Sequence, residues 1–63
     1  MKLVRHYKGG LYIEFARAME STNERQGREV VVYYSLSKNT WHTRDAIEFD
    51  SMVEGNRRRF SPE

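Results

Sequence analysis

The sequence predicts an all-β fold: a small SH3-like, five-stranded, partly open barrel with one short helical turn before the last strand. Three observations lead to this fold class. Glycine, serine and asparagine clusters divide the 63 residues into segments of strand length. The apolar residues are β-branched or aromatic where they cluster, as in the run at residues 30–34. The segments also occur in the order of a small barrel, and closing a sheet into a barrel suits so short a chain.

The first two strands form a hairpin around a pair of glycines. Residues 3–7 are the first strand, and Gly9 and Gly10 can take the positive φ angles that a tight turn needs. Residues 11–20 are the second strand, because apolar and polar positions alternate through Phe15. A helix over residues 13–25 is the rival interpretation, since alanine, methionine, glutamate and arginine are good helix formers. The alternation favours the strand.

The third and fourth strands form the middle of the predicted sheet. Residues 28–36 carry the strongest strand pattern, and their consecutive apolar residues are typical of a central strand covered on both faces. Residues 39–44 follow after a polar turn and carry Trp41. This segment should be the next strand.

The last third of the chain departs from simple alternation. Residues 44–48 have the composition of one helical turn, residues 49–53 resume as a short strand, and residues 57–60 can add an edge strand. We expect one domain over residues 1–63, in which residues 57–63 are either a flexible tail or an edge strand.

The core of such a barrel should contain the inward-facing apolar residues of each segment. We expect it to comprise Val4, Leu11, Ile13, Phe15, Val30, Val32, Tyr34, Leu36, Trp41, Ile47, Phe49 and Val53. The pattern alone leaves open which of Tyr33 and Tyr34 points inward.

Size and charge exclude several function classes. The longest apolar run is too short to cross a bilayer, and no apolar segment follows the basic N-terminus as in a signal peptide. The net charge of +2 is small, so the overall field gives little support to nucleic-acid binding. A chain without cysteine cannot use disulfides or a thiolate zinc site.

The chain carries no recognisable catalytic motif. His6 and His42, with Asp45 or Glu48, could form a metal triad, but their spacing matches no compact ligand motif. We expect two half-exposed strand histidines instead. No strand-to-helix G-x-S-x-G elbow is present, and the carboxylates form no conspicuous pair. The sequence therefore predicts a protein that is not an enzyme, with no catalytic residue, no metal and no cofactor.

Two basic segments are candidate contact sites. Backbone N–H groups at Tyr7, Lys8, Gly9 and Gly10 could form an anion-binding nest, although a plain hairpin turn explains the same residues. The run Arg57, Arg58 and Arg59 could pair with phosphates or with an acidic protein. A solvated chain end is the simpler explanation of that run.

The chain also resembles a known family of small bacterial and phage proteins, the domain of unknown function 1653. The residues that carry the resemblance are V-R-H-Y-K-G-G-L-Y at 4–12, V-V-Y at 31–33 with Ser35 and Leu36, Arg44, Phe49, Val53, Arg59 and Phe60. Asp45 stands where the family commonly has proline, and Glu20 where it commonly has histidine. The resemblance implies a compact β domain in the cytoplasm of a bacterium or of a phage-infected host cell.

These observations favour a small non-enzymatic binding module, a phage or bacterial accessory protein whose partner is another protein. The expected contact residues are Arg5, His6, Tyr7, Lys8, Gly9, Gly10, Tyr33 and Arg44. The alternative is a nucleic-acid or nucleotide binder that uses Lys8, Arg44, Arg57, Arg58 and Arg59 on phosphate. A homodimer would suit so small a core, and no membrane contact is expected.

Overall fold

The chain folds into one five-stranded antiparallel sheet and a separate two-stranded ribbon. The computed structural model describes the backbone of residues 1–63 and all side chains except that of Arg25. The strands of the sheet are β1 (Lys2–His6), β2 (Leu11–Met19), β3 (Glu29–Ser35), β4 (Thr40–Asp45) and β7 (Phe60–Pro62). Their spatial order is β4-β3-β2-β1-β7, so the last strand returns to lie beside the first.

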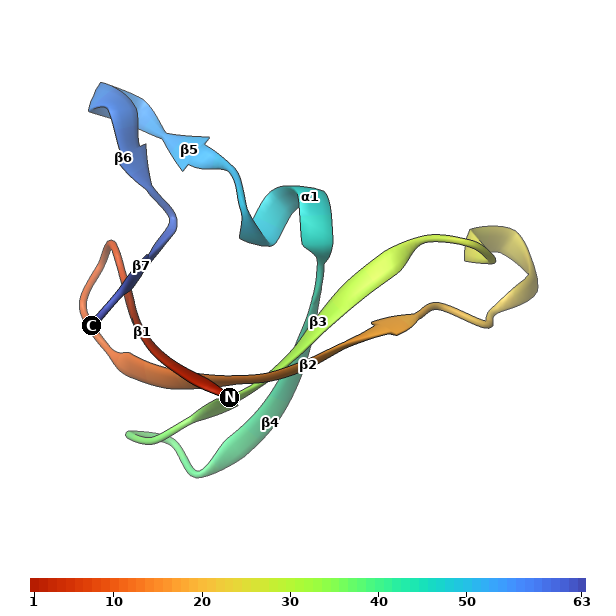
Figure 1. Ribbon diagram of the computed structural model, residues 1–63, viewed down its shortest axis with the longest axis horizontal. Coiled ribbons are helices and arrows are strands. Elements are labelled where there is room, and N and C mark those ends of the chain that lie inside the picture. Colours follow the sequence, from red (N-terminus) through yellow and green to blue (C-terminus); the bar gives the residue numbers. More distant parts are fainter.

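Short elements connect β4 to β7 across the open side of the sheet. They are α1 (Ala46–Phe49), β5 (Met52–Val53), the 3₁₀ turn η2 (Glu54–Asn56) and β6 (Arg57–Arg58). Figure 1 shows the sheet curling into a partly open barrel, with α1 and the β5–β6 ribbon above it. The predicted class, a small all-β fold with a partly open five-stranded sheet and one short helical turn, is confirmed. The predicted last strand at residues 49–53 is wrong, because Phe49 belongs to α1 and only Met52–Val53 is extended, as β5 of the ribbon. The fifth strand of the sheet is β7 instead. In the described chain no helix has the length and apolar character needed to cross a membrane.

The inner strand β2 contains a β-bulge at Phe15. Glu14 pairs with Tyr33 and Ala16 with Val32, so Phe15 is an extra residue in the ladder. A bulge bends a strand and increases its twist, and β2 here pairs with β1 on one side and β3 on the other. The strand extends through Met19, so the helical alternative for residues 13–25 is wrong apart from the 3₁₀ turn η1 (Asn23–Arg25).

The core uses the opposite face of β3 from the one predicted. Val31 is fully buried and Tyr33 is only 4% exposed, whereas Val32 and Tyr34 are half-buried on the other face. The buried apolar residues are Val4, Val30, Val31, Tyr33, Ala46, Phe49 and Phe60. Side chains alternate along a strand, and a run that is apolar on both faces does not itself specify which face is inside.

Other core predictions have mixed outcomes. Val4, Val30 and Phe49 are buried as predicted. Four residues predicted to be in the core are exposed: Phe15, Leu36, Trp41 and Ile47. Leu11, Ile13 and Val53 are half-buried. For Phe15 and Trp41 the cause is that a domain of this size buries a single face of its sheet and leaves much of the other in solvent. Leu36 follows the end of β3 and Ile47 belongs to α1, so neither lies on a face of the sheet.

Aromatic packing closes the barrel. The Tyr33 ring lies 5.3 to 5.5 Å from the rings of Tyr12, Phe49 and Phe60. Phe49 belongs to α1 and Phe60 to β7, so this cluster ties the end of the chain to the central strand. Residues 57–63 are accordingly part of the ordered fold as β6 and β7.

Candidate functional site

The glycine turn between β1 and β2 has a geometry that requires glycine. The His6 carbonyl accepts the Gly9 N–H at 2.8 Å, and the Gly10 carbonyl accepts the His6 N–H at 3.1 Å. Gly9 and Gly10 have φ angles of 95° and 86°, a region that side chains rarely tolerate. A Cβ at Gly10 would also lie 3.3 Å from the Tyr12 ring. The turn is therefore fixed both by its backbone and by the ring packed against it.

Three of the four backbone N–H groups that could form an anion nest are already used within the chain. The Tyr7 N–H donates to the Arg59 carbonyl at 2.9 Å, the Lys8 N–H donates to Nδ1 of His6 at 3.2 Å, and the Gly9 N–H is used within the turn. These donors already have acceptors inside the chain, so they are not available to a ligand. An anion at this turn would have to be held by side chains.

His6 is a structural residue of the turn. Its Nδ1 accepts the Lys8 N–H, which places the ring proton of the neutral form on Nε2. Burial lowers the pKa of His6, and the nearby positive charges of Arg44, Arg59 and Lys8 lower it further.

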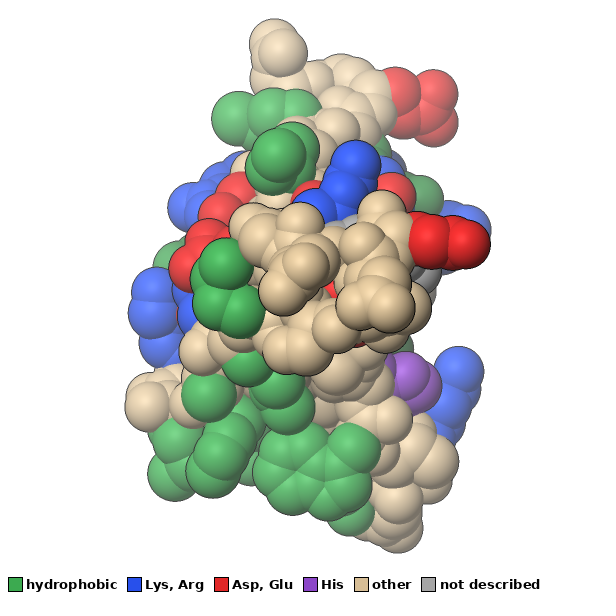
Figure 2. All heavy atoms as spheres, turned by 90° about the vertical axis from the view of Figure 1, so that its right-hand side faces the viewer, with side chains coloured by type: hydrophobic (Ala, Val, Ile, Leu, Met, Phe, Trp, Pro, Cys, Tyr) green, Lys and Arg blue, Asp and Glu red, His purple; other side chains and the backbone are tan. Residues whose placement is uncertain are grey.

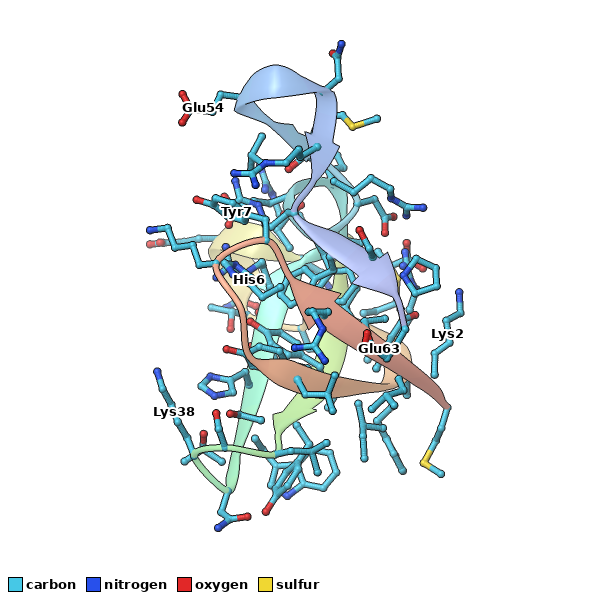
Figure 3. The ribbon with its side chains drawn as sticks, turned by 90° about the vertical axis from the view of Figure 1, so that its left-hand side faces the viewer. Lys2, His6, Tyr7, Lys38, Glu54 and Glu63 are labelled. Atoms are coloured by element: carbon cyan, nitrogen blue, oxygen red, sulfur yellow. The ribbon has the colours of Figure 1, made fainter. Side chains whose placement is uncertain are left out.

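The Tyr7 ring collects cations from two distant parts of the chain. Nζ of Lys8 and Cζ of Arg57 each lie 5.7 Å from the ring centroid, and Cζ of Arg59 lies 6.0 Å from it. These are cation–π distances, in which the negative face of the ring attracts the charge. The fold thus brings the two predicted basic segments together, and Figure 3 shows Tyr7 beside His6 at the turn, close to the β6–β7 segment.

A concave pocket of about 290 Å³ lies between the turn and β6, and we call it the Tyr7 pocket. Its lining residues are Arg5, His6, Tyr7, Arg57, Arg58 and Ser61. This lining contains guanidinium groups and a hydroxyl and no carboxylate. Arg5 is also bonded to Glu63 next to the pocket, with its Nη2 2.7 Å from Oε1 of that carboxylate. The chemistry of the lining suits an anion.

Two of the predicted contact residues are used inside the fold instead. Tyr33 is a core residue, so the expectation that it offers an exposed flat surface is wrong. Arg44 donates from Nε to the Tyr33 hydroxyl at 3.3 Å and from Nη1 to Glu48 at 2.6 Å. Both contacts stabilise the charged form and raise the pKa of Arg44. Arg44 therefore already has partners within the chain. The surroundings of both side chains are determined by tertiary packing and not by the local sequence pattern.

The two histidines lie on the same side of the sheet, flanking Tyr12. The ring centroids of His6 and His42 are 6.2 and 6.4 Å from that of Tyr12. His42 stacks on Tyr33 and shares a 2.8 Å hydrogen bond between Nε2 and Oγ1 of Thr40. No group of three histidine, cysteine, aspartate or glutamate side chains suitable for a metal occurs among the described residues. The geometry therefore gives the metal hypothesis no support.

A second surface escaped the sequence reasoning. The strand register places Leu3 opposite Ile13, Ile13 opposite Tyr34 and Tyr34 opposite Trp41. This apolar row crosses four strands on the face opposite the core, and Phe15 joins it, with its ring 5.4 Å from that of Trp41. We call these five residues the aromatic face. Figure 2 shows hydrophobic side chains gathered over the lower part of the molecule, below the barrel as seen in Figure 1.

The aromatic face is open to solvent. Trp41 is 60% exposed, Phe15 50% and Leu3 43%. The apolar run of β3 predicts a strand covered on both faces, but Val32 and Tyr34 on its outer face are only half-buried. The signal that could have corrected this is chain length, because 63 residues do not supply a second layer to cover the outer face.

The aromatic face reaches an unprotected sheet edge. β4 pairs only with β3, contains no proline or glycine, and keeps an unbroken register. Its charged residues Arg44 and Asp45 are neutralised by Glu48 and Arg28. The opposite edge, β7, is three residues long and contains Pro62. Proline, short length and free charges are the usual protections of an edge strand, and β4 has none of them.

Comparison with known proteins identifies the family of the chain. A family model described as "Protein of unknown function (DUF1653)" matches residues 2–62, nearly the whole chain. No curated protein and no solved structure matches. The resemblance seen in the sequence is thus confirmed, and its characteristic glycine motif forms the turn beneath the Tyr7 pocket. The chain belongs to the DUF1653 family of proteins of unknown function.

Proposed function

We propose that this chain is a non-enzymatic binding module that contacts a protein partner through the aromatic face and the adjoining β4 edge. The observation that carries the proposal is the exposed contact of Trp41 with Phe15 and Tyr34, at ring-centroid distances of 5.4 and 5.0 Å. Exposed apolar residues scattered singly need no explanation, but a contiguous group of this kind is typical of interaction surfaces.

The composition of the face matches that of protein interfaces. Tryptophan and tyrosine are enriched among the residues that dominate binding energy, because they bury large areas with few rotatable bonds. Trp41 lies at the β4 end of the row and Leu3 at the β1 end, and the rings of Tyr34 and Phe15 contact that of Trp41. Neighbouring aromatic side chains of this kind commonly form binding hot spots.

The β4 edge adds backbone donors and acceptors to the same surface. An extended segment of a partner can add a strand to an open sheet edge, which supplies affinity through main-chain hydrogen bonds. Trp41 belongs to β4 itself, so a strand added at this edge would lie next to the aromatic face. A protein partner therefore satisfies both features at once.

Catalysis has no part in the proposal. Six carboxylates of the described side chains are held in ion pairs, as Asp50 is by Arg17 and Glu63 by Arg5. By analogy with the phage and bacterial proteins that the chain resembles, we place it in the cytoplasm as an accessory protein.

The test is recovery of partners from lysate by the immobilised chain, with two matched variants. Trp41→Ser removes the most exposed ring of the aromatic face, and Ile47→Ser removes an apolar side chain that is 84% exposed on α1. We expect the partner to bind the wild type and Ile47→Ser equally and to bind Trp41→Ser at least about tenfold more weakly, as for a hot-spot residue. Equal recovery by all three would contradict the proposal.

Sedimentation of the purified chain distinguishes two possible partners of the aromatic face, a different protein or a second copy of this chain. The proposal predicts a monomer at concentrations where the partner binds. A dimer that Trp41→Ser dissociates and Ile47→Ser does not would make the aromatic face a homodimer interface instead.

A further inference from the structure

We propose that the Tyr7 pocket binds one compact, multiply charged phosphate group, such as a phosphomonoester or a pyrophosphate. The site is separate from the aromatic face and is independent of the protein-binding proposal. Its pocket has about 290 Å³ of space and is lined by Arg5, Arg57, Arg58 and Ser61 together with Tyr7 and His6.

Much of the positive charge at this pocket is not held in ion pairs within the chain. The carboxylates in ion pairs among the described side chains are Glu14, Glu29, Asp45, Glu48, Asp50 and Glu63. Of these, Glu63 is paired with Arg5 of the lining, and Asp50 is near enough to Arg58 for their charges to interact without an ion pair. Lys8, Arg57 and Arg58 take part in none of these ion pairs. The small net charge of +2 therefore conceals a local concentration of cations.

The Tyr7 ring preorganises part of that charge. It attracts the side chains of Lys8, Arg57 and Arg59 to within 5.7 to 6.0 Å of its centroid. Cations gathered around one ring repel one another, and the half-buried ring offsets only part of that repulsion. A bound anion would relieve the remainder. Arginine presents a planar fork of donors that matches phosphate oxygens, and the Ser61 hydroxyl in the lining adds another donor.

The arrangement favours a compact phosphate over a nucleic-acid strand. Tyr7 already contacts these cations and the His6 ring, whose centroid is 4.7 Å away, so it is not free to stack a base. Nucleic-acid binders use a basic stripe that follows the backbone, whereas these cations surround one ring. The volume lies at the lower end of the range for small-molecule pockets. A phosphomonoester carries a charge of −1.5 to −2 near neutral pH, about twice that of a carboxylate.

The experiment is a titration of the isotope-labelled chain with pyrophosphate, followed by NMR at about 0.15 M salt, where weak nonspecific attraction is screened. We expect saturable shifts at Arg57, Arg58 and Ser61. The double variant Arg57→Gln, Arg58→Gln should bind at least about tenfold more weakly, because it loses charge-assisted hydrogen bonds. Lys38→Ala, which removes a cation in the β3–β4 turn far from Tyr7 (Figure 3), should bind like the wild type.

A second pair of variants tests the role of the ring. Tyr7→Phe keeps the aromatic ring that attracts the cations, and it should retain its affinity for pyrophosphate. Tyr7→Leu should weaken binding about twofold to fivefold. Circular dichroism confirms that each variant is folded, and Trp41→Ser should bind pyrophosphate normally.

Three results would overturn the proposal. One is equal affinity of the wild type and the arginine double variant for pyrophosphate, or no saturable binding at all. Another is binding of citrate as tight as that of pyrophosphate, because citrate carries several carboxylates and no phosphate. The third is tighter binding of a single-stranded oligonucleotide with a steep dependence on salt, which would assign the cations to a nucleic-acid backbone.

Discussion

The rings of Phe49 and Phe60 stack 4.1 Å apart, with an angle of 9° between their planes. Phe49 ends α1 and Phe60 begins β7, so this contact fastens the last strand of the chain over the open side of the sheet. The rings of Tyr12 and Tyr33 meet Phe60 edge-on at 5.6 and 5.5 Å. Both phenylalanines are only 3% exposed. The closure of the barrel therefore depends on a few aromatic side chains.

Phe60→Ala should remove most of the stability of the domain. Truncating a buried phenylalanine typically costs about 3–5 kcal/mol, because the site is left with a cavity. A chain of this size has a free energy of unfolding of only about 3–9 kcal/mol. Urea denaturation measures the loss. Phe15→Ala, at a ring that is 50% exposed, should cost about 1 kcal/mol, and equal losses in the two variants would show that Phe60 does not close the core.

Alanine at Gly10 should destabilise the chain more than alanine at Gly9. Both positions have positive φ, so each substitution should cost at least about 1 kcal/mol. Only at Gly10 would the new Cβ also press on Tyr12, whose ring is hemmed in by Tyr33 and Phe60. Thermal melting of the two variants gives the comparison. If Gly9→Ala proves the more harmful, the ring does not limit the turn.

Stability should fall as the pH drops through the ordinary range of histidine. The folded state lowers the pKa of His6, so it disfavours the proton that the unfolded chain accepts near pH 6.5. The contribution of neutral His6 is complete above that pH and is lost as the pH falls toward the lowered, folded-state value. Urea midpoints at pH 8 and pH 5 measure this loss.

His6→Asn is the matched variant for that measurement. The asparagine carbonyl oxygen can accept the Lys8 N–H in place of Nδ1 and does not titrate. The variant should therefore lose less stability than the wild type between pH 8 and pH 5. An identical loss in both proteins would assign the pH dependence to another group.

Asp50→Asn should weaken the domain by no more than about 1 kcal/mol, because the Arg17–Asp50 pair is open to solvent. The pair is bidentate, at 2.8 and 2.9 Å, and it lowers the pKa of Asp50. Its contribution is present above the ordinary aspartate pKa and is lost as the pH falls through the lowered one. Denaturation at low and high salt should show a larger effect at low salt. Glu54→Gln changes a carboxylate outside the ion pairs of the described side chains and should leave the free energy of unfolding unchanged. If it lowered that free energy as much as Asp50→Asn does, the Arg17–Asp50 pair would contribute nothing specific.

The fold was predictable because its determinants are local. The glycine turn separates β1 from β2, and alternation through Phe15 identified β2 despite its helix-forming residues. The bulge at Phe15 was not predictable, since it appears only when Glu14 and Ala16 are matched to β3. The prediction of which face of β3 points inward was wrong for the same reason, because the partner strands and α1 determine which face is buried.

The candidate sites depended on contacts between distant residues. Local sequence indicated that Tyr7 and Lys8 lie at a turn and that Arg57 is basic, but not that Arg57 would lie against the Tyr7 ring. The aromatic face was missed because Trp41 and Phe15 were assigned to the core by hydrophobicity alone. A large aromatic residue suits a core and an interface equally well, and only the fold distinguishes the two.

Site-specific photo-crosslinking in cells that produce the chain tests the protein-binding claim most directly. A benzophenone amino acid replaces Trp41 at the β4 end of the aromatic face or Ile47 on α1, both of which are exposed. Our account predicts a discrete adduct with one partner protein from position 41 and none from position 47. Adducts of the same pattern from both positions, or none from position 41, would contradict it.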